Sequence, residues 1–179
     1  MQALFAALLD LIREPLRLDG GVKTDNSILL IYPPEKELDF RGYLQDSFIP
    51  QLRADRVPFQ LLDLTGFLFD ELSEETLRNL QEDEFDDYRW MKQGLSTRVE
   101  AALRKRISQL AEESPGCAVI VYNTVALHPM VRYGEVLRDL RDIPCRTVLA
   151  FPGEERGGKL HFMNQADGGN YLAVKLFWK

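Results

Sequence analysis

The chain has 179 residues, of which 45% are hydrophobic and 28% charged, a balance typical of a globular domain. A chain of this length buries enough surface to fold as one domain without a disulfide or a structural metal. The formal net charge of −6 argues against a duplex-binding protein, since phosphate contacts usually require a basic surface.

The N-terminal part of the chain predicts a helix, a buried strand and a second helix. Apolar residues recur at helical spacing over 4–12, and Pro15 is expected to end that helix. Residues 27–32 form a continuous apolar run, which is typical of a strand buried on both faces. A helix is expected from Pro34 onward, and Pro50 should kink or end it.

Further apolar runs of strand length follow at residues 59–64, 117–122, 145–151, 160–163 and 171–177. Residues 65–114 have a helical pattern, with a break expected near Gly94 and a capping box formed by Thr97 and Glu100. Another helix is expected over 130–141. This alternation predicts an α/β fold with a mainly parallel central sheet, helices on both faces, and 65–114 as a helical insertion within a single domain spanning 1–179.

Two cysteines, Cys117 and Cys145, each open an apolar run. We interpret both as small buried hydrophobic residues in a reducing compartment. If the two runs are neighbouring strands, the thiols lie close together, and a disulfide is then the alternative.

In open parallel sheets, ligands bind beyond the carboxyl ends of the strands. The polar residues at or near these ends form a possible ligand edge: Tyr32, Glu35, Asp63, Asn123 and Glu154. A phosphate-binding loop would follow the first strand, but two prolines remove N–H donors there and Glu35 repels phosphate. Glu35, Asp63 and Glu154 could instead converge on Mg²⁺, although helix capping and turn chemistry explain each one separately.

The rest of the sequence contains no recognisable catalytic or metal-binding motif. His128 and His161 lack further nitrogen or sulfur ligands at the spacing of a zinc site, and no G-x-S-x-G elbow occurs. We therefore predict no catalytic residues, no bound metal and no cofactor, and we favour a binding protein over an enzyme.

The acidic and aromatic segment at residues 82–90 is the candidate partner-binding surface. Asp86 and Asp87 lie beside Tyr88 and Trp90, and exposed aromatic rings among carboxylates suit a basic protein partner. Tyr88 and Trp90 are about 200° apart around a helix, so both rings cannot face the core. The alternative is that the aromatic residues pack inward and only the acidic residues face water.

The densest basic run comprises Arg98, Arg104, Lys105 and Arg106. A solvated helix face explains such a run, so direct nucleic-acid binding is not expected. No apolar run approaches the roughly 18–20 residues of a membrane span, and the first residues lack the features of a signal peptide. These observations predict a cytoplasmic protein that does not enter the membrane.

Three parts of the sequence together resemble one protein family. Residues 31–38 follow the first strand, residues 148–153 end a later strand, and residues 160–164 and 170–177 lie near the end of the sequence. Their order and spacing are similar to BrxB, the small α/β component of bacterial BREX phage-defence systems. The resemblance spans nearly the whole chain, and residues 65–114 are its least family-like part.

The resemblance implies a cytoplasmic protein encoded beside a large ATPase, a DNA methyltransferase and PglZ, an alkaline-phosphatase-like protein. The family offers no established catalytic residues. Together with the acidic surface and the lack of a catalytic constellation, the resemblance favours a non-catalytic adaptor that binds other BREX proteins, with PglZ as the expected partner. The alternative is a nucleotide- or metal-dependent enzyme that uses the carboxyl edge of the sheet at Glu35, Asp63, Asn123 and Glu154.

Overall fold

The computed structural model describes residues 1–16, 26–70, 73–76, 78, 88–140, 143–166 and 173–178, and for residues 88–93 it describes the backbone alone. Within these ranges the helical elements are α1 (Gln2–Arg13), η1 (Pro34–Lys36), α2 (Glu37–Tyr43), η2 (Leu44–Phe48), α3 (Ile49–Ala54), α4 (Phe67–Asp70), α6 (Tyr88–Glu113), η4 (Thr124–Leu127) and α7 (Tyr133–Asp139). The strands are β1 (Ser27–Tyr32), β2 (Phe59–Asp63), β3 (Ala118–Tyr122), β4 (Arg146–Arg156), β5 (Lys159–Phe162), β6 (Gln165–Ala166) and β7 (Val174–Phe177).

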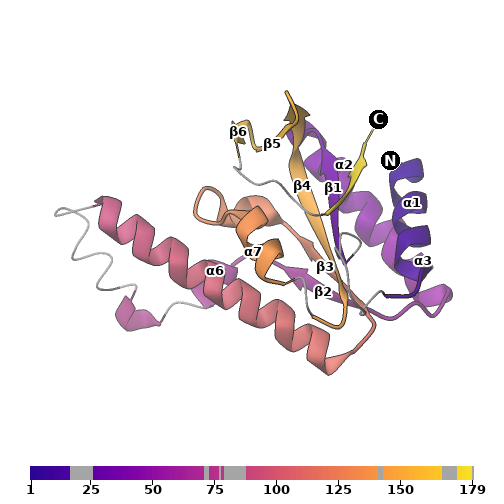
Figure 1. Cartoon of the computed structure of the whole chain (residues 1–179), viewed down its shortest axis with the longest axis horizontal. Helices are drawn as coiled ribbons and strands as arrows, with labels where there is room; N and C mark the ends of the chain where they lie inside the picture. The colour runs from indigo at the N-terminus through magenta and orange to yellow at the C-terminus, as the bar shows by residue number, and fades with distance from the viewer. Residues whose placement is uncertain are drawn as a thin grey trace.

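The central sheet has the strand order β2-β3-β4-β1-β7, and each neighbouring pair in this series is parallel (Figure 1). This arrangement confirms the predicted mainly parallel α/β sheet. β4 was expected to end at Phe151, but it continues through Pro152 and Gly153 to Arg156. Its last residues pair antiparallel with β5, which pairs in turn with β6.

Helices cover both faces of the sheet, as predicted (Figure 1). Alternate residues of a strand point to opposite faces, so Ile28 and Leu30 join one apolar cluster while Leu29 and Ile31 join the other. The first cluster is completed by α1, α2, η2 and α3, and the second by α4, α6, η4 and α7. Both faces of β1 are therefore buried, which is why its sequence is apolar without alternation.

The predicted break near Gly94 is wrong, because α6 runs without interruption from Tyr88 to Glu113. A glycine in a helix interior costs only about 1 kcal/mol relative to alanine. Burial of Val99, Leu103 and Ile107 against the sheet outweighs that cost. The predicted helical insertion at 65–114 therefore contains α6. This helix lies between β2 and β3 in the chain and covers one face of the sheet.

Pro50 was expected to kink or end its helix, and it does not end the helical path. The path passes through the π-helical segment η2, just before Pro50, and continues in α3 to Ala54. The wider π turn accommodates a proline ring that would clash with the carbonyl of a regular preceding turn. The last predicted helix, expected from Met130, begins at Tyr133 as α7. In the part of the chain that the structure describes, no helix is long and apolar enough to span a membrane.

Cys117 and Cys145 are buried free thiols immediately before β3 and β4, which are neighbours in the sheet. Burial raises the pKa of both thiols, and the neighbouring Cys117 adds to the effect at Cys145, whose pKa reaches about 12. The thiolate is the form that reacts with alkylating reagents. We therefore expect iodoacetamide to leave the native protein unmodified at pH 8 while alkylating both cysteines in urea, as read by intact mass. Equal labelling rates in the two states would contradict this account of the burial.

Candidate functional site

The carboxyl ends of the parallel strands lie at one edge of the sheet. Asp63 at the end of β2 is in register with Tyr122 at the end of β3, and Tyr32 at the end of β1 is in register with Pro152 of β4. This confirms that the strand ends chosen from the sequence share an edge. The edge is where an open α/β sheet offers side chains to a ligand or a partner.

The Asp63 carboxylate links the ends of β2 and β3 through hydrogen bonds. Its Oδ1 accepts a bond from the backbone N–H of Thr65 at 2.8 Å and another from Nδ2 of Asn123 at 2.7 Å. The same Asn123 amide donates to the Thr65 hydroxyl at 2.9 Å. Asn123 has a φ of 56°, a left-handed conformation that asparagine tolerates better than most residues. The local backbone therefore presents the Asn123 amide to the carboxylate.

The hydrogen bonds at this edge hold Asp63 in its charged form. Burial acts to raise the pKa of Asp63, but hydrogen bonds from Thr65, Asn123 and Tyr122 outweigh that effect and lower it. The pKa of Tyr122 is raised, first by burial and then by its hydrogen bond to Asp63. At neutral pH the Tyr122 hydroxyl is protonated and donates to an ionised carboxylate.

Replacing Asp63 with asparagine should lower stability at neutral pH and have less effect in acid. A carboxylate with a depressed folded-state pKa contributes stability above its unfolded pKa, and the contribution is lost as pH falls through the folded pKa. Because Asp63 is an exposed residue, we expect a loss of only about 1 kcal/mol or less at pH 7. Urea unfolding of both proteins at pH 7 and at about pH 3 measures the difference. A difference that grows in acid would contradict the assignment.

The side chain of Tyr32, at the end of β1, contacts residues of α2. Its ring is 1% exposed and stacks on Phe40, with ring centroids 4.1 Å apart. Its hydroxyl donates to Oε2 of Glu37 at 2.6 Å. Burial, followed by the charge of Glu37, raises the pKa of Tyr32, so the phenol remains protonated. Its observed contacts are those of a buried structural residue.

Glu35 and Glu154 do not join Asp63 in a metal-binding group. Glu35 is exposed on η1, and Glu154 forms an ion pair with Arg156 in the β4–β5 hairpin. Among the described residues there is no group of three or more His, Cys, Asp or Glu side chains that could hold a metal ion. Of the five residues predicted for the ligand edge, the structure links Asp63 and Asn123 through a hydrogen bond.

The predicted partner-binding segment lies at the border of the described structure. Asp86 and Asp87 lie outside the described residues. Tyr88 and Trp90 belong to the first turn of α6, and their side chains are likewise outside the description. Their role in partner binding stays a prediction.

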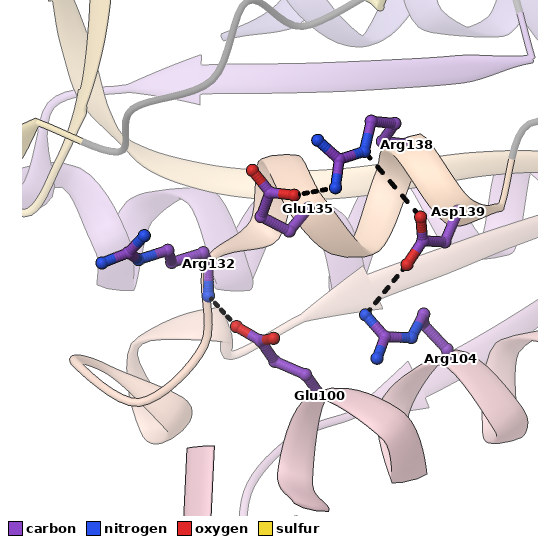
Figure 2. Close-up of polar contacts among 6 residues, drawn as sticks. All are labelled: Glu100, Arg104, Arg132, Glu135, Arg138 and Asp139. Atoms are coloured by element: carbon purple, nitrogen blue, oxygen red, sulfur yellow. Dashed lines mark hydrogen bonds and ion pairs between the residues drawn. The ribbon is translucent and has the colours of Figure 1, made fainter. Parts of the chain in front are cut away.

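Glu100 and Arg104 of α6 bind α7 through polar contacts (Figure 2). Oε1 of Glu100 accepts a hydrogen bond from the backbone N–H of Arg132 at 2.9 Å, just before α7 begins. Glu100 was expected to cap its own helix, and instead it binds the start of the next one. Nη1 of Arg104 lies 3.2 Å from a carboxylate oxygen of Asp139, so one charge of the predicted basic run is neutralised. The cluster in Figure 2 comprises Glu100, Arg104, Arg132, Glu135, Arg138 and Asp139.

Two exposed apolar residues near the carboxyl edge were assigned to helices from the sequence without being recognised as surface features. Leu38 on α2 is 73% exposed and Phe69 on α4 is 66% exposed. The exposure of Phe69 could have been expected from the sequence. Residues 67–69 are all apolar, and a helix turns 100° per residue, so these three side chains cannot all face the protein core.

The sheet topology and its two helical layers define an α/β protein of the open parallel-sheet class. A family model described as BrxB, BREX protein BrxB, matches residues 61–176, which is more than half of the chain. The chain belongs to the BrxB family, as the resemblance predicted, and is therefore a component of a BREX phage-defence system. The match includes residues 65–114, the part that had been considered least family-like. No curated protein and no solved structure matches the chain.

Proposed function

We propose that this BREX component is a non-catalytic adaptor that binds larger BREX proteins, with PglZ as its direct partner. The observation that carries the proposal is the internal hydrogen bonding of the carboxyl edge. Asp63 accepts bonds from Thr65 and Asn123, and the Tyr32 hydroxyl donates to Glu37. Side chains that would meet a substrate in an α/β enzyme instead bind one another here.

Such bonds suit a surface that docks a protein. They fix the end of β2 to β3 and the end of β1 to α2, so side chains at this edge have less freedom to lose on binding. Ordering mobile side chains costs roughly 0.5–1.5 kcal/mol each on association, and a pre-ordered surface avoids part of that cost. The net charge of −6 additionally favours encounter with a basic surface.

The adaptor proposal is tested by recovering the tagged chain from cells that carry the whole BREX operon. We expect PglZ to be recovered with it at about 0.1 M salt, a concentration that preserves most interface electrostatics. The control is the same tagged chain in cells whose operon lacks the PglZ gene, where the other BREX proteins should be depleted if PglZ is the direct partner. Recovery of the chain alone in the complete operon would contradict the proposal.

The second candidate is a nucleotide- or metal-dependent enzyme at Asp63 and Asn123. It is favoured by one observation, namely that Oδ1 of Asn123 is buried and has no hydrogen-bond partner among the residues that the structure describes. A ligand that supplied a donor there at 100 times its dissociation constant would stabilise the protein by about 2.7 kcal/mol. Melting curves with ATP, GTP, Mg²⁺ and Mn²⁺ separate the two candidates, and the adaptor proposal expects no shift with any of them.

A further inference from the structure

Phe69 is held on the surface by the way α4 follows β2. Gly66, with a φ of 79°, allows the tight turn between them, and Phe69 N–H donates to the Gly66 carbonyl at 2.8 Å. Phe67, two residues earlier, is 5% exposed and belongs to the core. Two residues along a helix are about 200° apart around its axis, so a rotation that turned Phe69 inward would remove Phe67 from the core. The 66% exposure of Phe69 is thus a consequence of the local fold.

Two carboxylate residues lie close to Phe69 in the sequence: Asp63 at the end of β2 and Asp70 in α4. Asp63 is fixed by its bonds from Thr65 and Asn123. Asp70 follows Phe69 in α4, and its Oδ2 lies 3.9 Å from the position that a Cβ on Gly66 would occupy. Neither Asp63 nor Asp70 forms an ion pair with any residue that the structure describes. An exposed aromatic ring and two carboxylates that form no ion pair within the described structure therefore belong to one short stretch of chain.

We propose that Phe69, Asp63 and Asp70 form a docking surface for an arginine-bearing, partly apolar surface of another BREX protein. The proposal rests on the adaptor function and names the surface through which it acts. Charge complementarity selects the occupant, because two carboxylates without an ion-pair partner among the described residues attract a cation. Among cations, arginine also stacks on aromatic rings and binds carboxylates through two parallel hydrogen bonds. Apolar atoms around that arginine would cover the Phe69 ring, as at interface hot spots.

The test measures binding of purified PglZ to the full chain and to three variants by biolayer interferometry. Phe69→Ala should weaken binding by about thirtyfold, the typical effect of truncating a hot-spot aromatic residue. Asp70→Asn should weaken it severalfold and reduce its dependence on salt, since one cross-interface charge is removed. The matched control is Asp10→Asn, which removes an exposed carboxylate near the end of α1 that Arg146 binds, and should leave affinity unchanged.

Melting temperature serves as the check on folding. Both Phe69 and Asp70 are exposed, so their variants should melt within a few degrees of wild type. If Phe69→Ala unfolds, Asp70→Asn still decides the question through its affinity and salt dependence. Wild-type affinity for PglZ in both variants would overturn this surface and leave the adaptor function standing.

Two further outcomes would also overturn the proposal. If the wild-type chain does not bind PglZ, both the partner and the surface are wrong. If sedimentation velocity shows that Phe69→Ala abolishes self-association while PglZ binding is unchanged, the occupant of the surface is a second copy of this chain.

Discussion

Replacing Gly153 with alanine should destabilise the protein by about 3 kcal/mol or more, because the added methyl group has no space. A Cβ at this position would stand 2.0 Å from the carbonyl oxygen of His161 and 2.9 Å from the Phe151 ring. Gly153 is buried in β4 opposite Phe162 of β5, and the closest obstacle is backbone. The two strands must separate to relieve the contact, which exposes the apolar side chains beneath the hairpin.

The control for this variant is Gly94→Ala, in which the added Cβ has no described atom within 4 Å apart from its chain neighbours and the backbone of its own helix. Gly94 is exposed within α6, so alanine should stabilise the protein there by up to about 1 kcal/mol. Chemical unfolding of both variants measures the difference, and the two midpoints should move in opposite directions. A Gly153→Ala protein as stable as wild type would show that β4 and β5 do not pack as closely as described.

The second large effect is expected at Arg146, whose side chain binds the end of α1. Arg146 is 4% exposed, and its guanidinium donates to the backbone carbonyls of Ile12 at 3.3 Å, Glu14, and Pro15 at 3.2 Å. A cation at a helix C-terminus also interacts favourably with the helix dipole. Methionine retains the apolar stem but supplies no donors, so Arg146→Met should cost about 3 kcal/mol.

Arg13→Met is the matched control for this variant. Arg13 forms an ion pair with Asp55 at 2.8 Å, but its side chain is 49% exposed. Exposed pairs contribute about 1 kcal/mol or less, so this variant should remain near wild-type stability. Hydrogen exchange should show that Arg146→Met loses protection in α1 before the central strands. Equal destabilisation by the two substitutions would contradict the role assigned to Arg146.

The sequence predicts the buried strands well because their signal is local. Residues 27–32 were expected as a strand and form β1 with the same limits, since both faces of that strand are apolar. The continuation of β4 past Gly153 could not be predicted in this way, because it depends on pairing with β5. The uninterrupted course of α6 through Gly94 likewise depends on its packing against the sheet.

The candidate site was predictable only in part, for a related reason. Asp63 and Asn123 each follow an apolar run, which placed them at the carboxyl edge from sequence alone. Their hydrogen bond requires β2 and β3 to be neighbours in the sheet. The order of the strands cannot be predicted from either apolar run. The exposure of Phe69 depends on which ring of the 67–69 segment enters the core, and the packing of Phe67 decides this.

The adaptor function is tested most directly by mixing the purified chain with purified PglZ of the same system and measuring sedimentation velocity. An adaptor that binds PglZ directly should give a faster-sedimenting complex that contains both proteins, with a dissociation constant of about 1 µM or tighter, in the range of specific protein complexes. The complex should form without added nucleotide or metal. Two independent boundaries at about 100 µM of each protein would contradict it, because an interaction weaker than that falls short of a stable adaptor contact.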